Sequence, residues 1–274
     1  MRPPGVLCSL YVPGDRPDRF AKALATAADL VVIDLEDSVT AKAAAREHVR
    51  RFLMSGVELD RISIRINSGP EAPADLVLLR EIAAAGLAPS EIRVPKVNTP
   101  ADLDELAQLQ AIRVHALIES AAGVQALPGI AAHPAVVAVG LGEADLAGEL
   151  ALGDEDAFTY CRSRLVVAAA AAGLRPPAMS VHADIRDLSG LAESCRRGRL
   201  LGLFGRSAVH PSQIPVIRMA FAPSDSEITS ARQTLDALDR AALAGQGVAT
   251  TADGTMVDAA MRAGAERILA FAPE

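Results

Sequence analysis

Acidic side chains follow two consecutive apolar runs within residues 114–146. Glu119 follows the first run, V-H-A-L-I, and Glu143 and Asp145 follow the second run, V-V-A-V-G-L. A segment with helical character, at about residues 121–132, lies between the runs, which is typical of a strand–helix–strand unit. Because ligands bind beyond the carboxyl ends of parallel strands, these carboxylates should meet at one site. Two such carboxylates suit Mg²⁺, which keeps water and substrate oxygens in its remaining coordination positions.

Three more acidic residues lie within or directly after the end of an earlier apolar run, L-V-V-I-D-L. Asp34, Glu36 and Asp37 stand so close together that they need a cation or an arginine nearby. The continuous β-branched run itself favours a parallel strand that is covered on both faces. The alternative is simpler, because Asp37 or Ser38 could cap the helix that we expect at residues 41–52.

Basic side chains lie near the ends of other predicted elements. Arg65 stands within the run I-S-I-R-I, where a buried guanidinium needs an anionic partner. Its planar shape suits the capture of a carboxylate through two hydrogen bonds. Lys96 lies at the tip of the strand predicted for I-R-V-P-K-V. Arg16 and Lys22 lie near the start of a helix expected through residue 28, where a phosphate could bind; two solvated cations are the alternative.

The order of these segments predicts a (β/α)₈ TIM barrel. Eight short apolar runs alternate with segments that can form helices, the last of which is expected at residues 213–221. The runs begin near residues 6, 30, 62, 92, 114, 136, 178 and 200. We expect the seventh strand at residues 178–181 and the eighth at residues 200–204. The active site of such a barrel is built from the carboxyl ends of the strands. A doubly wound sheet with the same alternation is the structural alternative.

We expect two parts in the chain. Residues 1–222 form the barrel and the catalytic domain. Residues 223–274 form a helical C-terminal extension, with an amphipathic helix at residues 228–244 and a Gly-rich passage before T-M-V-D. We interpret this extension as a lid and a contribution to an oligomer interface.

Composition excludes several classes of partner. The chain has 274 residues, half of them apolar, so it can bury a large core. The formal net charge of −7, the pI near 5.3 and the lack of a long Lys/Arg run argue against nucleic acid as a partner. No apolar run reaches the ~18 residues of a membrane span. Three cysteines without metal-binding spacing suit packing in a reducing compartment, so we expect a cytoplasmic protein.

Seven motifs fall in order along the chain and carry a family resemblance. They are L-Y-V-P-G-D-R-P-D-R-F-A-K-A-L, V-V-I-D-L-E-D-S-V, R-I-N, V-P-K, A-L-I-E-S-A-A-G, G-E-A-D-L and V-H-P-S-Q-I. With T-M-V-D near the C-terminus, they resemble the citrate lyase β-subunit-like family, which includes malyl-CoA and citramalyl-CoA lyases. The resemblance covers residues 7–258. It implies a Mg²⁺-dependent carbon–carbon lyase that cleaves or forms a 3-hydroxyacyl-CoA, with an acetyl-CoA-type thioester and a 2-oxo acid as the smaller molecules.

The resemblance also implies roles around the metal for the matching residues. Glu119 and Asp145 hold Mg²⁺. Glu36 and Asp37 support the water shell of the metal, and Arg65 binds the 2-oxo acid. Glu143, which the spacing alone does not separate from Asp145, becomes a loop residue or a supporting residue.

Coenzyme A and proton transfer involve other positions in this resemblance. Arg16 and Lys22 are expected near the phosphates of coenzyme A, and Tyr11 beside its pantetheine. Asp258 is expected over the site of a neighbouring subunit as the acid/base, which requires a homo-oligomer such as a trimer or a dimer of trimers. Taken without the resemblance, Asp258 is most simply the N-cap of the last helix.

The sequence departs from the family pattern at a few positions. G-L-F-G-R stands where members commonly show G-F-D-G-K, so Phe204 replaces an acid and Arg206 replaces a lysine. The aromatic residues that often precede M-V-D are absent. Because the metal-binding motifs are intact, these differences concern substrate identity and lid closure more than the chemistry. His182 and His210 match family positions, and we interpret both as structural hydrogen-bonding residues.

Two other functions stay open at this point. The chain could be the β subunit of a citrate lyase complex, which acts on a citryl thioester of an acyl-carrier protein. It could instead be a non-catalytic member that binds an acyl-CoA without turnover, although the retention of Glu119, Asp145, Arg65 and Asp258 argues against that. The sequence does not distinguish malyl from citramalyl thioesters, because pocket size depends on how the side chains are placed.

Overall fold

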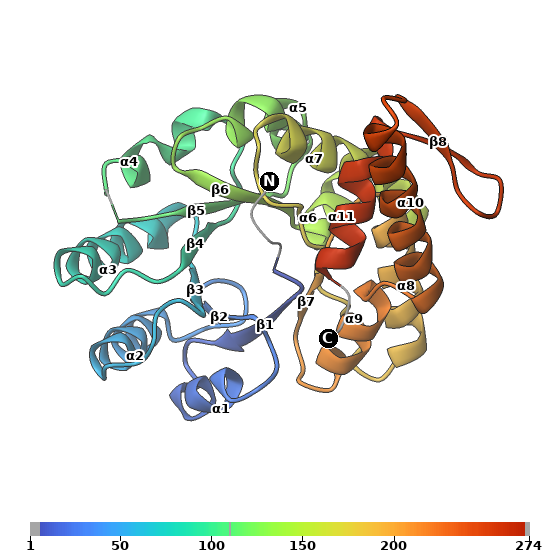
Figure 1. The fold of residues 1–274 in the computed structure, drawn as a ribbon. Coiled ribbons are helices and arrows are strands. Elements are labelled where there is room, and N and C mark those ends of the chain that lie inside the picture. Colours follow the sequence, from blue (N-terminus) through green and yellow to red (C-terminus); the bar gives the residue numbers. More distant parts are fainter. Residues whose placement is uncertain (1–5, 110, 272–274) are drawn as a thin grey trace. The chain divides into compact units, whose positions relative to one another are not determined.

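The computed structural model of the chain describes residues 6–109 and 111–271. The chain divides into two compact units, Met1–Ala220 and Phe221–Glu274. Among the described residues of the first unit, seven strands form one parallel sheet in the order β6-β5-β4-β3-β2-β1-β7 (Figure 1). The strands are β1 (Cys8–Pro13), β2 (Leu30–Asp34), β3 (Ile62–Arg65), β4 (Glu91–Val94), β5 (Val114–Ile118), β6 (Val136–Leu141) and β7 (Arg206–Ala208).

Helices follow the strands along the chain. They are α1 (Phe20–Leu24), α2 (Lys42–Met54), α3 (Ala72–Ala84), α4 (Asp104–Ala107), α5 (Ala121–Ala131), α6 (Glu143–Leu150), α7 (Thr159–Ala171), α8 (Leu188–Leu200) and α9 (Gln213–Phe221). Short 3₁₀ segments precede some of them: η1 (Pro17–Arg19), η2 (Gly69–Glu71), η3 (Pro100–Leu103) and η4 (Glu155–Phe158). Within the described parts of the chain, no helix is both long enough and apolar enough to cross a membrane.

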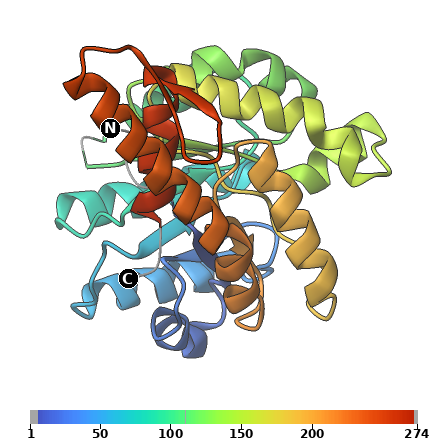
Figure 2. The same cartoon turned by 45° about the vertical axis from the view of Figure 1, so that its right-hand side comes forward.

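The sheet is covered on both faces, which explains its continuous apolar runs. Every residue of β2 and of β5 is buried, as expected for parallel strands that have neighbours on either side. Figures 1 and 2 show the sheet curling, with the helices of this unit along its outer side. The prediction of a barrel of alternating strands and helices is confirmed as a curled, TIM-barrel-like parallel sheet.

The seventh predicted strand is wrong in its extent. Residues 178–181 contribute a single parallel bridge, between Met179 and Arg206. Pro176 and Pro177 come directly before this segment and carry no backbone N–H group. The ladder therefore cannot extend toward the N-terminus as it does in the other strands.

The eighth predicted strand, at residues 200–204, is also wrong. The apolar letters there belong to the end of α8 and to a turn, and the strand itself is β7, just downstream. Gly202 and Gly205 have φ values of +90° and +85°, which turn the chain after the helix. A Cβ at Gly205 would overlap the backbone of Leu7. Leu203 is buried in this turn, so the segment is apolar like a strand although it does not form one.

The second unit is a small helical body with a hairpin. It consists of α10 (Asp225–Leu243), β8 (Val248–Thr250), β9 (Met256–Asp258), η5 (Ala259–Met261) and α11 (Arg262–Ala270). Ser224 and Glu227 form a capping box at the start of α10. Strands β8 and β9 pair antiparallel, and Val257 packs on Ala237 and Leu238 of α10. Its role as a lid and oligomer contact stays a prediction.

Candidate active site

The predicted site residues of the first unit lie at the carboxyl ends of its strands. Asp34 ends β2 and Arg65 ends β3, and the register of the sheet pairs these two residues. Glu119 directly follows β5. Asp145 lies in the first turn of α6, just after β6. Parallel pairing thus gathers at one edge of the sheet residues that are far apart in the sequence.

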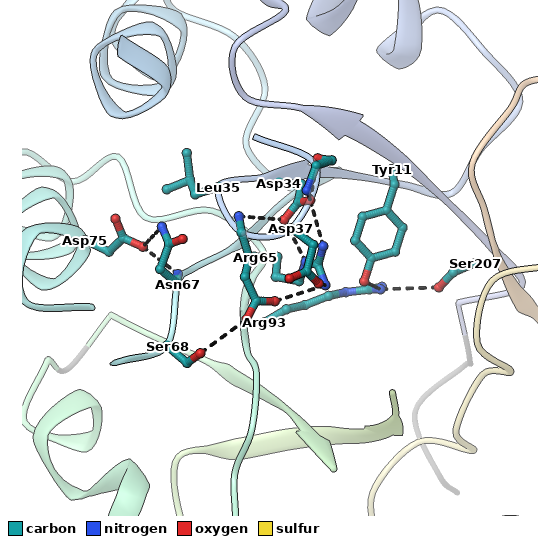
Figure 3. A network of polar contacts seen from close by, with 12 residues as sticks. Tyr11, Asp34, Leu35, Asp37, Arg65, Asn67, Ser68, Asp75, Arg93 and Ser207 are labelled. Atoms are coloured by element: carbon teal, nitrogen blue, oxygen red, sulfur yellow. Dashed lines mark hydrogen bonds and ion pairs between the residues drawn. The ribbon is translucent and has the colours of Figure 1, made fainter. Parts of the chain in front are cut away.

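Carboxylates of the chain itself bind the Arg65 guanidinium (Figure 3). Its Nε donates to Asp34 Oδ1 at 2.6 Å, and its Nη2 donates to Asp34 Oδ2 at 2.7 Å. Its Nη1 donates to Asp37 Oδ2 at 3.0 Å and forms an ion pair with Glu36 Oε2 at 3.1 Å. Asp34 is therefore the anionic partner that this arginine needs. All three nitrogens of this guanidinium thus contact carboxylates of the chain itself.

Asp34 is held firmly by its surroundings. Its Oδ1 accepts from the backbone N–H of Glu36 at 2.9 Å, and its Oδ2 accepts from Ser38 Oγ at 2.5 Å. Burial raises the pKa of Asp34, but the hydrogen bonds and the charge of Arg65 outweigh it and keep the pKa below its usual value. The capping alternative is wrong, because no side chain, neither Asp37 nor Ser38, caps α2.

Two other carboxylates at this edge are buried but only partly compensated. Glu36 is 5 % exposed, and its Oε1 accepts from Ser68 Oγ at 3.3 Å and lies 3.8 Å from Lys96 Nζ. Its contact with Arg65 Nη1 lacks the geometry of a hydrogen bond, so Glu36 Oε2 has no hydrogen-bond donor. Glu119 is 6 % exposed, and its Oε2 accepts from the backbone N–H of Lys96 at 3.2 Å.

The pKa values of these two carboxyls reflect burial first and mutual repulsion second. Burial raises the pKa of Glu36 to about 7, although Arg65 and Lys96 oppose the rise. Burial also raises the pKa of Glu119 to about 7, and the negative charges of Glu36 and Asp145 raise it further. The three carboxylates therefore form a region of negative charge that the protein alone does not neutralise.

Gly142 makes room for the Glu119 carboxylate. A Cβ at position 142 would lie 2.5 Å from Glu119 Cγ and 2.7 Å from its Cδ. Gly142 has φ −94° and ψ 84°, so the need for glycine comes from this contact rather than from the backbone. Its N–H donates to the carbonyl of Ile118, which fixes the chain between β6 and α6 against the end of β5.

The donor set fits a hard divalent cation. Among the described residues, no three His, Cys, Asp or Glu side chains converge closely enough to enclose a metal. A closed structural site is therefore absent from that part of the chain. Glu119 and Asp145, with Glu36 beside them, instead offer oxygen donors and unmet negative charge. This is the environment of Mg²⁺, which takes one or two carboxylates and keeps waters or substrate oxygens.

Glu143, in contrast, is committed to a different partner. Its two carboxylate oxygens accept from Arg162 Nε at 2.7 Å and Arg162 Nη2 at 2.9 Å. Arg162 is buried on α7, and its Nη1 also donates to Glu155 at 3.0 Å. This clamp fixes the first turn of α6, two residues before Asp145. In the structure, Glu143 is paired with Arg162 and stabilises the start of the helix that carries Asp145.

Tyr11 lies between two guanidinium groups (Figure 3). The carbon centres of Arg65 and Arg93 each lie 5.3 Å from the centroid of its ring. Its hydroxyl accepts from Arg93 Nη1 at 3.1 Å, and Arg93 also donates to Ser9 and Ser207 in the interior of the sheet. Tyr11 thus belongs to the wall beside Arg65, and its contact with pantetheine stays a prediction.

The two cations predicted for coenzyme A are exposed. Arg16 pairs with Asp18 at 3.2 Å, and Lys22 lies on the surface of α1. The helix expected through residue 28 is shorter than predicted, because η1 leads into α1 and α1 ends at Leu24. Phosphate binding by Arg16 and Lys22 stays a prediction.

Asp258 ends β9 in the second unit. Its Oδ1 accepts from the backbone N–H of Ala260 at 2.9 Å, so it caps η5. This is the simple role that we considered for it, and the acid/base role stays a prediction. His182 and His210 make local contacts, the first at 3.7 Å from Asp187 and the second with Ser212 Oγ at 2.8 Å.

Sequence reasoning missed three contributors to this site. It placed Lys96 at a strand tip, but not its backbone N–H on Glu119. It grouped Asp34 with its acidic neighbours, but did not separate it as the partner of Arg65. Gly142 had no assigned role, although it lies between the apolar run of β6 and the acids that follow, a place where a small residue often leaves room for a ligand or side chain.

A sequence profile for HpcH/HpaI aldolase/citrate lyase matches residues 7–211. The chain belongs to the HpcH/HpaI aldolase/citrate lyase family. The resemblance that the seven motifs carry is thereby confirmed. The profile spans the whole sheet and every carboxylate of the candidate site in the first unit.

Individual relatives of this family extend the match beyond the sheet. A citrate lyase subunit beta-like protein of Mycobacterium tuberculosis (strain ATCC 25618 / H37Rv) is 36 % identical over 276 residues, which cover 97 % of this chain and 95 % of the relative. An L-malyl-CoA/beta-methylmalyl-CoA lyase of Cereibacter sphaeroides (strain ATCC 17029 / ATH 2.4.9) is 32 % identical over 301 residues, with 96 % and 93 % covered. The crystal structure of protein CitE from Mycobacterium tuberculosis in complex with magnesium, acetoacetate and coenzyme A has a TM-score of 0.83 at 35 % identity, over 100 % of both chains.

Proposed function

We propose that this protein is a Mg²⁺-dependent carbon–carbon lyase that acts on a 3-hydroxyacyl-CoA such as malyl-CoA or citramalyl-CoA. Its products, or its substrates in the reverse direction, are an acetyl-CoA-type thioester and a 2-oxo acid. The observation that carries the proposal is that Glu36, Glu119 and Asp145 lie near the Arg65 guanidinium, and that the first two are buried with raised pKa values. Two relatives support the proposal. One is named as an L-malyl-CoA/beta-methylmalyl-CoA lyase, and the other was crystallised in complex with magnesium, acetoacetate and coenzyme A.

Each charged residue has a defined task in this reaction. Glu119 and Asp145 hold the metal, and Glu36 and Asp37 hold its water shell. Bound Mg²⁺ acts as a Lewis acid on the hydroxyl or keto oxygen of the substrate. Arg65 orients the carboxylate of the 2-oxo acid and offsets its charge.

The bond that breaks lies between C2 and C3 of the hydroxyacyl chain. Its electron pair stays on C2 and gives the enolate of the smaller thioester, while C3 becomes the keto carbon of the 2-oxo acid. Asp258 takes the hydroxyl proton and returns it to C2 of the enolate, which completes the smaller thioester; in the reverse direction it moves a proton from the methyl group of the thioester to the new alkoxide. We propose that this Asp258 comes from a neighbouring subunit of a trimer or a dimer of trimers, and that Arg16, Lys22 and Tyr11 bind coenzyme A.

The first experiment incubates the protein with Mg²⁺, acetyl-CoA or propionyl-CoA, and a panel of 2-oxo acids. Mass spectrometry of the products identifies the thioester that forms. We expect a condensed hydroxyacyl-CoA for at least one pair. Reaction only with an acyl-carrier-protein thioester would make the chain a citrate lyase β subunit. Acyl-CoA binding without any product would make it a non-catalytic member.

Two variants test the metal assignment in the same assay. Glu119→Gln and Asp145→Asn each keep the shape of the side chain but remove the charge that binds Mg²⁺. We expect each to lower turnover by roughly a hundredfold or more, because the Lewis acid is lost. Glu58→Gln, at an exposed acid of the same unit, should leave turnover unchanged. Circular dichroism checks that the variants fold, and undiminished turnover in either site variant would remove the metal assignment.

A further inference from the structure

Lys96 has a backbone conformation that L-residues seldom adopt. Its φ is +55°, and in the described parts of the chain it shares a positive φ only with Ala151 among residues other than glycine. Ala151 is exposed at the C-cap of α6, where the left-handed conformation is a common way to end a helix. Lys96 lies at no helix end. Unfavourable backbone conformations outside helix ends cluster at active sites and ligand-binding sites, where they are retained for function.

The segment around Lys96 is held in place on both sides. Pro95 precedes it and fixes its own backbone angle. Val97 follows it, is buried, and donates its N–H to the carbonyl of Leu117 in β5 at 3.1 Å. The chain therefore leaves β4, makes one left-handed step at Lys96, and returns to the sheet beside the strand that leads to Glu119.

The left-handed conformation of Lys96 lets this residue contact two carboxylates, one through its backbone N–H and the other through its ammonium group. The backbone N–H of Lys96 donates to Glu119 Oε2 at 3.2 Å. Its ammonium lies 3.8 Å from Glu36 Oε1, and its side chain is 48 % exposed. Lys96 and Arg65 both pair with the Glu36 carboxylate. The ammonium is thus at the site edge and open to solvent, whereas the N–H is fixed on a buried carboxylate.

We propose that Lys96 is a positioning residue with two separable tasks: its left-handed peptide group aims the Glu119 carboxylate at the metal, and its ammonium orients the Glu36 carboxylate. The second task rests on the proposed lyase function. The first task concerns metal binding alone. The motif V-P-K does not reveal these two tasks, because both depend on the φ value that Lys96 adopts in the structure.

Opposite effects on metal affinity separate these tasks. The ammonium repels a divalent cation, so its removal leaves Mg²⁺ affinity unchanged or raises it. The aimed N–H favours the ligand geometry of Glu119, so its loss lowers Mg²⁺ affinity. Lys96→Met removes only the charge and keeps an L-residue of similar length. Lys96→Val removes the charge as well, but its β-branched side chain also disfavours the left-handed region far more than methionine does, so the backbone N–H is driven away from Glu119.

The experiment measures Mg²⁺ binding by calorimetry in the absence of substrate, and kcat and KM for the thioester pair found above. We expect Lys96→Met to bind Mg²⁺ at least as tightly as the wild type, with kcat lowered about tenfold or more. We expect Lys96→Val to bind Mg²⁺ about tenfold more weakly than Lys96→Met, as for the loss of a hydrogen bond to a charged group. Lys96→Arg, which keeps the charge, should recover part of the lost kcat.

Ala151→Val is the matched control, since it places a β-branched residue at the other left-handed position, away from the site, and should leave Mg²⁺ affinity unchanged. Equal Mg²⁺ affinity in Lys96→Val and Lys96→Met would overturn the backbone task. Wild-type kcat and KM in Lys96→Met would overturn the ammonium task. If the wild type turns over no acyl-CoA, the proposed function fails, but the comparison of the two Mg²⁺ affinities still decides the backbone task.

Discussion

At the scale of single residues, the site depends on a glycine as much as on its acids. We expect Gly142→Ala to push the Glu119 carboxylate aside, because a Cβ would lie 2.5 Å from Glu119 Cγ. Its φ of −94° is accessible to alanine, so the backbone is not strained. Mg²⁺ affinity should fall about tenfold, as expected when a ligand is displaced from its geometry, whereas the fold should survive. Calorimetric titration with Mg²⁺ measures the first effect and thermal unfolding the second.

Gly148→Ala on α6 is the control for that substitution. A Cβ there meets nothing within 4 Å, and alanine in a helix interior stabilises by about 0.5–1 kcal/mol relative to glycine. We expect a slightly higher melting temperature and unchanged Mg²⁺ affinity. If Gly142→Ala bound Mg²⁺ like the wild type, either Glu119 would not be a ligand or its position would be far more adaptable than the contact implies.

The residues that sequence could predict are those whose type alone decides their chemistry. Glu119 and Asp145 follow apolar runs in the sequence, which predicts their place at the carboxyl ends of two strands, and the structure has both there; their role as metal ligands stays a prediction. The partner of Arg65 could not be chosen among three neighbouring acids, because the choice depends on the register that pairs Arg65 with Asp34. Lys96 is a similar case, since a φ angle leaves no mark in the sequence when the residue is not glycine.

At the scale of elements, strands were predictable where apolar burial on both faces was continuous. Strands β1 to β6 lie where the apolar runs placed them, because most of their residues are buried; β1 to β5 each have a strand on either side, and β6 pairs with β5. The runs near residues 178 and 200 misled for a local reason. Pro177, directly before the run at 178, has no N–H to donate to a neighbouring strand. Gly205 lets the chain pass close to Leu7, but only after the apolar run that begins near residue 200 has ended.

The interior of the sheet holds a buried polar group that should make stability depend on pH. His115 on β5 bonds through Nδ1 to Glu91 Oε1 on β4 at 3.0 Å, and Arg93 and Arg175 also pair with Glu91. Burial lowers the pKa of His115 to about 4, and the charges of Arg93 and Arg175 oppose the pull of Glu91. The folded protein therefore keeps His115 neutral at pH values where the unfolded chain protonates it.

We expect the free energy of unfolding to fall as pH drops from about 6.5 toward 4. In this window the unfolded state binds more protons than the folded state, so stability rises with pH and is complete above the unfolded pKa. The contribution of His115 is on the order of 3 kcal/mol across the window. Urea unfolding at several pH values should show a shallower slope for His115→Gln than for the wild type. His210→Gln, at an exposed imidazole, should keep the wild-type slope, and equal slopes in all three proteins would contradict the assignment.

At the scale of the whole molecule, the proposed chemistry draws on both units of the chain. The carboxylates Glu119 and Asp145 belong to the first unit, and Asp258 belongs to the second. Asp258→Asn keeps an acceptor for the N–H of Ala260, so η5 should stay capped. We therefore expect this variant to lose kcat while it keeps KM, because only proton transfer is removed.

Subunit mixing tests whether Asp258 acts on the site of a neighbour. Asp258→Asn and Glu119→Gln should each be inactive alone, and co-expression under two affinity tags allows mixed oligomers to be purified. If each site combines Glu119 of one subunit with Asp258 of the next, every mixed trimer has one complete site in three, so the purified mixed trimers regain about a third of wild-type activity. If both groups came from one chain, no mixture would regain activity, because every subunit lacks one of them. Oligomers that carry both substitutions in one chain, mixed with wild type, provide the control for activity gained by assembly alone.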